Sequence, residues 1–274
     1  MPREARAWDL RRSSGRREIF YCSGGGGLAG AWSVDPARPE IDVIRGITHL
    51  SFDADGTLWD FETVMREGLR RAAAAIVARH PEAKGLDGER LRAVRDAVAA
   101  ELPPPHDHAR IRRRGFARAL EEIGCPDDAF AARLSREYLA FRLTAIRVFP
   151  EVEPTLRQLA RHFTLGLVSN GNTDPVRAPP GVAFGFQVFA ASCGVAKPDP
   201  GIFAAALRAA GCPAERMLHV GDSLADDVAC PQALGIRAVW LDRRGDGDTA
   251  GAVPDLVVRS LGELLDHLEL PGGG

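Results

Sequence analysis

The chain has 274 residues, of which 45% are hydrophobic and 26% charged, with a formal net charge of −2 and a pI of about 6.4. This length accommodates one large domain or one domain with an insert, and the composition is ordinary for a globular protein. The balanced charge provides no basic field for nucleic acid or a membrane surface. No apolar run approaches the roughly 18 residues of a spanning helix. We therefore predict no nucleic-acid and no membrane partner.

The five cysteines lie far apart and include no CxxC pair, so their spacing fits neither a zinc cluster nor a disulfide framework. The basic N-terminus is not followed by the apolar stretch of about 7–15 residues that a secretory signal needs. Both observations predict a reduced, cytoplasmic protein. The sequence indicates no particular oligomeric state.

Residues 1–46 differ from the remainder of the chain. They combine arginine pairs, a run of four glycines and the prolines Pro36 and Pro39, with little periodicity. Such composition predicts a poorly ordered N-terminal extension. A sharper hypothesis is that the natural protein starts later, near Val43, from an alternative start codon.

A glycine spacing in this extension, Gly25-x-Gly27-x-x-Gly30, formally matches the dinucleotide fingerprint. That motif has to open a helix. The residues that follow, Ser33-Val34-Asp35-Pro36, do not favour one, so we expect no nucleotide site here.

The apolar residues 47–52 predict a buried strand that ends at Asp53-Ala54-Asp55-Gly56-Thr57. Side chains two apart on a strand point the same way, so Asp53 and Asp55 are expected to share one small space. Two like charges about 4 Å apart repel by about 4 kcal/mol at an effective dielectric near 20. The pair then needs a cation, a shared proton or an ion pair. The alternative is that the Asp-Gly step is only a turn.

Residues 59–147 show helical periodicity and no convincing strand. Asp60 is a good N-cap for a first helix, and four consecutive alanines favour its interior. Glycines and prolines separate the segments that follow. We predict a small helical bundle with helices at 61–79, 88–101, 109–123 and 127–146.

Several side chains of this bundle and its entry have a structural and a functional interpretation. The arginines of the third helix are expected to form a solvated face, with contact between one of them and a substrate as the alternative. His106 and His108 lack a matched partner for a metal site. Trp59 and Phe61 border the strand end, but core packing is the more economical interpretation. The arginines in question are Arg110, Arg112, Arg113, Arg114 and Arg118.

From residue 148 onward, short apolar strands alternate with helices, which predicts a parallel sheet covered on both faces. We therefore expect an α/β fold with a Rossmann-like core formed by residues 47–60 and 148–270. Pro231 falls inside the last helix and should distort it, because proline removes a hydrogen bond. The expected strands are 163–168, 187–190, 217–220 and 236–241, and the expected helices are 152–161, 200–210 and 224–234.

Four polar groups lie at the ends of these strands or in nearby loops, where open α/β sheets bind ligands. They supply carboxylates, a hydroxyl, an amide and a lysine, which phosphoryl transfer needs for positioning and charge neutralisation. An aspartate can form an acyl-phosphate that water later hydrolyses, and an oxygen-rich site suits Mg²⁺. The groups are Asp53 with Asp55, Ser169 with Asn170, Lys197, and Asp222 with Asp226 and Asp227.

Over residues 46–268 the chain resembles the haloacid dehalogenase superfamily of hydrolases. Each motif alone is weak, but four in order at suitable strand ends are specific. The helical insert at 61–147 resembles the cap domain of the subgroup that contains many small-metabolite phosphatases. The motifs stand as Asp53-Ala54-Asp55-Gly56-Thr57, Leu167-Val168-Ser169-Asn170-Gly171, Val195-Ala196-Lys197-Pro198-Asp199-Pro200 and Gly221-Asp222-Ser223-Leu224-Ala225-Asp226-Asp227.

The resemblance implies a role for each catalytic residue. Asp53 is expected to attack phosphorus. Asp55 is expected to protonate the leaving oxygen and then to activate water. Ser169 and the neighbouring Asn170 amide should hold phosphate oxygens, and Lys197 should neutralise the phosphate and the aspartates.

The resemblance also implies a Mg²⁺ site. Asp53, the main-chain carbonyl of Asp55, and Asp222 are its expected ligands. Asp227 aligns with the final acid of the last motif. It is expected to hold the metal-site residues in position without binding the metal itself. Asp226 is expected to be peripheral.

The resulting hypothesis is a Mg²⁺-dependent phosphatase that hydrolyses a small phosphorylated metabolite through an aspartyl-phosphate. The haloalkanoate dehalogenases of the superfamily lack an acid at the position of Asp55, which counts against dehalogenation. A phosphomutase with the same core stays open. The non-enzymatic alternatives are a phospho-accepting module, although receiver domains are shorter and lack the insert, and an inactive binding relative.

Overall fold

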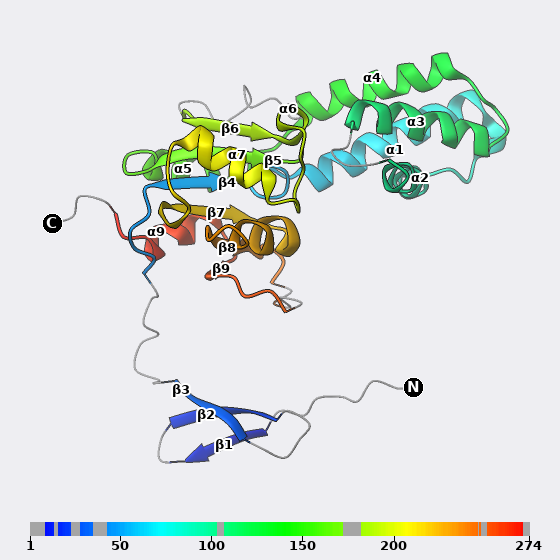
Figure 1. The fold of residues 1–274 in the computed structure, drawn as a ribbon. Helices are drawn as coiled ribbons and strands as arrows, with labels where there is room; N and C mark the ends of the chain where they lie inside the picture. The colour runs from blue at the N-terminus through cyan, green and yellow to red at the C-terminus, as the bar shows by residue number, and fades with distance from the viewer. Residues whose placement is uncertain are drawn as a thin grey trace. The chain divides into compact units, whose positions relative to one another are not determined.

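The computed structural model describes residues 9–13, 16–22, 28–34, 43–102, 107–171, 182–245, 247 and 251–270 (Figure 1). The chain divides into two units, Met1–Val43 and Ile44–Gly274. In the first unit three antiparallel strands pair in the order β1-β2-β3. These strands are β1 (Asp9–Ser13), β2 (Arg16–Cys22) and β3 (Leu28–Val34).

We expected little regular structure in residues 1–46, whereas three strands are present there. Ile19, Phe20 and Tyr21 in β2 are of the β-branched and aromatic types that favour strands. Gly30 lies inside β3 and not at the start of a helix, whereas Gly25 and Gly27 lie outside the described residues. The disorder of the extension and the later start stay predictions, as do the domain boundaries.

The second unit is built on a parallel sheet, as predicted, and its six strands lie in the order β6-β5-β4-β7-β8-β9. Each expected strand is present within two residues of its predicted ends, and β9 is an addition that the sequence did not indicate. The strands are β4 (His49–Phe52), β5 (Thr164–Ser169), β6 (Phe186–Phe189), β7 (Met217–Gly221), β8 (Arg237–Leu241) and β9 (Leu256–Val258).

Helices cover both faces of this sheet. Alternate strand residues point to opposite sides, so each face has apolar side chains that a helix can bury. Leu50 and Phe52 pack into one hydrophobic core with α5 (Val152–Leu159) and α9 (Leu264–His267). Val168 and Met217 belong to a second core that contains α7 (Gly201–Ala210). The predicted Rossmann-like layering is therefore confirmed.

Four helices between β4 and α5 form a bundle, which Figure 1 shows beyond one end of the sheet. Each begins behind an aspartate whose carboxylate accepts a hydrogen bond from the first turn, as N-cap chemistry predicts. The bundle has its own hydrophobic core, separate from those of the sheet. Its helices are α1 (Phe61–Arg79), α2 (Gly88–Ala100), α3 (His108–Glu122) and α4 (Asp128–Ala145).

None of the helices in the described part of the chain is both long and apolar enough to cross a bilayer. The treatment of residues 61–147 as a separate cap domain stays a prediction, because the bundle and the sheet fall in one unit.

The helix expected at 224–234 is distorted, as Pro231 predicted. Leu224–Ala229 forms a π-helical turn, and α8 is limited to Cys230–Gln232 with the proline in its first turn. The proline has no N–H to continue the preceding ladder. The wide turn brings the carboxylate of Asp227 back to the main-chain N–H of Ser223, at 3.0 Å.

Candidate active site

The ends of three adjacent strands bring together most of the polar residues that the sequence singled out. In the order of the sheet, β5 ends at Ser169, Asp53 follows β4, and Asp222 follows β7. Parallel strands end at the same edge of a sheet, where ligands bind. Lys197 reaches this edge from the loop between α6 (Ala190–Cys193) and α7.

Lys197 is a fixed cation at the centre of this edge. Its Nζ lies 2.6 Å from Oδ1 of Asp53 and 2.6 Å from Oδ1 of Asp227, and all three side chains are buried. Burial opposes the charge of the ammonium, but Asp227 and Asp53 raise the pKa of Lys197 above its usual value. Such charge-assisted hydrogen bonds hold both carboxylates in place.

Asp227 is held from several sides. Besides Lys197 and the Ser223 N–H, it contacts His219, whose Nε2 lies 3.1 Å from its Oδ1. The other ring nitrogen of His219 lies 2.8 Å from Ser51 Oγ. Burial opposes the ionisation of Asp227, but Lys197 and His219 more than offset it and lower the pKa of Asp227. The sequence pointed to Asp227 but not to His219, whose signal is a lone histidine in an apolar strand.

The acidic side chains here fit a divalent cation. One carboxylate oxygen from each of Asp53, Asp222 and Asp227 lies within 4.8 Å of the others. Burial raises the pKa of Asp53 well above its ordinary value, with Asp227 and Asp222 adding to the effect and Lys197 opposing it. Burial and Asp227 raise the pKa of Asp222 to about 6. Three carboxylates thus face one ammonium, and hard oxygen donors suit Mg²⁺.

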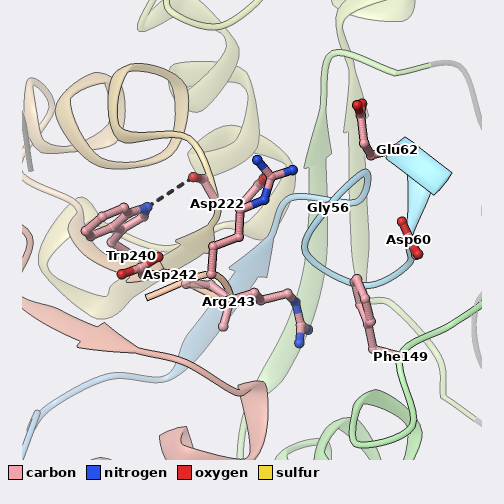
Figure 2. A pocket seen from close by; sticks show the side chains of 10 residues that line it. Gly56, Asp60, Glu62, Phe149, Asp222, Trp240, Asp242 and Arg243 are labelled. Atoms are coloured by element: carbon pink, nitrogen blue, oxygen red, sulfur yellow. Dashed lines mark hydrogen bonds between the residues drawn. The ribbon is translucent and has the colours of Figure 1, made fainter. Parts of the chain in front are cut away.

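Gly56 shapes the approach to Asp222. Its φ is 92°, a conformation that favours glycine, and a side chain there would collide with the Asp222 carboxylate. Residue 222 as a whole is exposed, yet its carboxylate is crowded on this side. Figure 2 shows Asp222 at a cavity of about 430 Å³, where Trp240 Nε1 donates a hydrogen bond of 3.0 Å to the main-chain oxygen of Asp222.

Arg243 supports the turn after β4 from the same cavity (Figure 2). Its Nη2 donates to the main-chain oxygen of Thr57 at 2.8 Å, and its guanidinium stacks 3.8 Å from the ring centroid of Phe149. It also pairs with Glu151. The turn that carries Asp55 and Gly56 is therefore fastened to the loop after β8.

Asp55 has the properties of a proton carrier. Trp59 Nε1 donates a 2.6 Å hydrogen bond to Asp55 Oδ1. Burial raises the pKa of Asp55, whereas Trp59 and the positive charges of Arg142 and His108 oppose that rise. A carboxyl group with a raised pKa suits general acid–base work. Trp59 is fully buried, as expected for a core residue, but it also orients Asp55.

Trp59→Phe is therefore expected to move the pH dependence of catalysis. The hydrogen bond from Trp59 favours the ionised form of Asp55, so its loss raises the pKa of Asp55 further. The limb of the kcat/KM profile that reports Asp55 should shift to higher pH by about 1–2 units, since a charge-assisted hydrogen bond contributes about 1.5–3 kcal/mol. The measurement is the pH profile of kcat/KM with an aryl phosphate as substrate. An unchanged profile in Trp59→Phe would contradict this role of Trp59.

Asn170 fastens the loop that carries Lys197. Its side-chain Oδ1 accepts from the Lys197 N–H at 2.8 Å, and its Nδ2 donates to the Lys197 main-chain oxygen at 2.9 Å. The sequence did not predict this structural task for Asn170. Ser169, fully buried, accepts a 3.0 Å hydrogen bond from the Gly171 N–H. Asp226, expected to be peripheral, lies 3.4 Å from Asn170 Nδ2.

A cavity of about 270 Å³ lies between the sheet edge and the helical bundle. Asp55, Asn170 and Gly171 line it from the sheet, and helices of the bundle line it from the other side. His108, at the start of α3, links the two sides because its Nε2 lies 2.8 Å from the Asn170 main-chain oxygen. The sequence missed this contact, and His106 lies outside the described residues.

The expectation of a solvated arginine face on α3 is wrong for Arg112. Arg110, Arg113 and Arg114 are exposed, but Arg112 is buried and lines this cavity. The physical reason is the helical period, which places position 112 on the same inward stripe as the buried Phe116.

The comparison with known families agrees with this geometry. The model of haloacid dehalogenase-like hydrolases matches residues 47–235. The chain belongs to this family. It is 31% identical over 227 residues to the 5-amino-6-(5-phospho-D-ribitylamino)uracil phosphatase YigB of Escherichia coli, covering 82% of this chain and 92% of that relative.

Two further relatives are hydrolases that are named for different activities. A phosphoserine phosphatase of Thermus thermophilus is 36% identical over 179 residues, covering 62% of this chain and 68% of the relative. The crystal structure of a 2-haloacid dehalogenase from Pseudomonas syringae superposes with a TM-score of 0.65 and 36% identity, covering 80% of this chain and 97% of the other. The predicted family, fold and hydrolase class are confirmed, and the named phosphatases support a phosphoric monoester hydrolase.

Proposed function

We propose that this haloacid dehalogenase-like hydrolase is a Mg²⁺-dependent phosphatase that hydrolyses a small phosphomonoester through an aspartyl-phosphate on Asp53. The observation that carries the proposal is the buried Asp53 carboxylate, held 2.6 Å from the Lys197 ammonium and beside Asp222 and Asp227. Relatives named as phosphatases of 5-amino-6-(5-phospho-D-ribitylamino)uracil and of phosphoserine support the same reaction class.

In this mechanism Asp53 is the nucleophile. Lys197 orients Asp53 through Oδ1, and a carboxylate oxygen attacks phosphorus as the ester P–O bond breaks. Bound Mg²⁺, held by Asp53, Asp222 and the main-chain carbonyl of Asp55, would neutralise charge on the phosphate. Ser169 and Asn170 are the proposed binding groups for phosphate oxygens, with Lys197 adding a positive charge.

Asp55 supplies and then removes the proton. It protonates the leaving oxygen of the ester, which completes the departure of the alcohol. In the second step Asp55 takes a proton from water, the hydroxide oxygen attacks the acyl-phosphate, and inorganic phosphate leaves while Asp53 is regenerated. The raised pKa of Asp55 favours the protonated form that the first step needs.

The presence of Asp55 also bears on the similarity to a 2-haloacid dehalogenase. Breaking a carbon–halogen bond requires no proton for the departing halide, whereas an alkoxide leaving group does. An acid oriented by Trp59 at the edge of the substrate cavity therefore supplies a proton that an ester leaving group needs and a departing halide does not.

Metal removal is expected to stop the reaction. With p-nitrophenyl phosphate as substrate, EDTA should reduce phosphate release by at least about 100-fold, because a catalytic metal contributes several kcal/mol of charge stabilisation. Added Mg²⁺ should restore the activity. Chloride release from 2-chloropropionate, measured in parallel, should stay at background. Halide release without phosphate release, or phosphate release that EDTA leaves unchanged, would contradict the proposal.

The natural substrate is to be found with a panel of phosphorylated metabolites. Phosphoserine and 5-amino-6-(5-phospho-D-ribitylamino)uracil belong in it because relatives are named for them. Analysis of the products separates release of inorganic phosphate from return of the phosphoryl group to a sugar, the outcome expected of a phosphomutase. The cytoplasmic location stays a prediction.

A further inference from the structure

The buried arginine of α3 lacks hydrogen bonds that a guanidinium normally makes. Arg112 is 8% exposed, and its Nε and Nη1 have no hydrogen-bond partner among the residues that the structure describes. Burying a charged group without partners is costly, and proteins retain such a group where a ligand or a counter-ion satisfies it.

The cavity that Arg112 lines has more positive than negative charge. Arg95 pairs with Asp96, with 2.9 Å between Arg95 Nε and Asp96 Oδ1. Two further guanidinium groups, of Arg112 and of Arg142 on α4, are buried at this cavity, which Asp55 also lines. Burial and the nearby charge of Arg142 lower the pKa of Arg112. An anion in the cavity would relieve this repulsion.

The same cavity reaches the proposed reaction centre, since Asp55, Asn170 and Gly171 form its sheet side. A phosphomonoester whose leaving oxygen lies at Asp55 therefore extends its other end toward the bundle. A planar guanidinium binds two oxygens of a carboxylate or phosphate at once, which a lysine does not. The volume of about 270 Å³ limits this other end to a small group.

We propose that Arg112 binds a second oxyanion of the substrate, a carboxylate or a second phosphate group remote from the ester that is cleaved. This inference rests on the proposed phosphatase function and narrows its substrate class to small phosphomonoesters with two anionic ends. Arg112 is in this view a specificity residue and touches no reacting atom.

The test compares matched esters. Phosphoglycolate and ethane-1,2-diol bisphosphate each carry a second anion, whereas ethyl phosphate carries none. For the wild-type enzyme, kcat/KM for one of the two charged esters should exceed that for ethyl phosphate, and which of them is preferred identifies the oxyanion. If neither is preferred, the inference is overturned. If none of the three releases phosphate, the proposed function itself fails.

Arg112→Met should then lower the ratio of kcat/KM between the preferred charged ester and ethyl phosphate by about 10- to 100-fold, the range for hydrogen bonds to charged groups. Arg112→Lys should recover only part of the ratio, because it keeps the charge without the planar fork. Arg113→Met, on the exposed face next to it, is the matched control and should leave the ratio unchanged. An unchanged ratio in Arg112→Met overturns the inference.

Thermal unfolding separates binding from a structural role. Removing a buried, unsatisfied charge while keeping the apolar stem should leave the Tm of Arg112→Met unchanged or raise it by about 2–4 °C. A marked fall in Tm with an unchanged substrate ratio would show that Arg112 serves only the packing of the bundle. If this variant does not fold, the wild-type preference among the three esters still decides.

Discussion

Asp53→Asn is expected to abolish phosphate release, with a loss of at least about 10³-fold, as when the nucleophile of a covalent mechanism is removed. The amide is a poor nucleophile and carries no charge for Mg²⁺. The fold should persist because asparagine has nearly the same size, and Lys197 keeps its 2.6 Å contact with Asp227. Asp53 has a raised pKa in the folded protein, so neutralising it removes an unfavourable charge.

The measurement is release of inorganic phosphate from p-nitrophenyl phosphate in saturating Mg²⁺, with thermal unfolding of the same preparations. Asp266→Asn, an exposed aspartate of α9, is the matched control and should keep full activity. Full activity of Asp53→Asn would remove the basis of the proposed mechanism. Loss of activity together with loss of the folded state would leave Asp53 with a structural role only.

Much of the fold was predictable from local chemistry. The caps Asp60, Asp87, Asp107 and Asp127 begin the bundle helices, and each accepts a hydrogen bond from its helix. Apolar runs bounded by polar residues marked the buried strands. The strand Leu256–Val258 was not predicted. It is three residues long and only its last residue is buried, so its sequence shows no alternation of apolar and polar residues.

Asp53 and Asp222 were predictable because each follows directly on a buried strand. Supporting contacts were not. His219 reaches Asp227 only after the π-helical turn folds back, and Trp59 reaches Asp55 across the turn that follows β4. The burial of Arg112 depends on which side of α3 faces the bundle, and an arginine-rich helix leaves that side ambiguous.

Lys197→Met is expected to inactivate the enzyme and to destabilise it. The substitution leaves Asp53 and Asp227 buried side by side without the ammonium that both contact at 2.6 Å. Removing one partner of a buried ion pair costs about 3–5 kcal/mol. Lys84→Met is the matched control, since Lys84 is the other lysine of the chain and is exposed. Urea unfolding in EDTA measures the free energy of unfolding without a contribution from bound metal.

The pH dependence distinguishes lost charge pairing from lost packing. In the wild type the pKa of Asp227 is lowered, so its ionised form stabilises the fold above the unfolded value of 3.8, and this stabilisation is lost as pH falls. Without Lys197 the pKa values of Asp227 and Asp53 rise, and their ionisation opposes folding. The difference in unfolding free energy between wild type and Lys197→Met should therefore be largest near neutral pH and shrink toward about pH 4. A difference that is independent of pH would indicate that the lysine stem stabilises the fold by packing, and that its charge has no part in holding the two carboxylates.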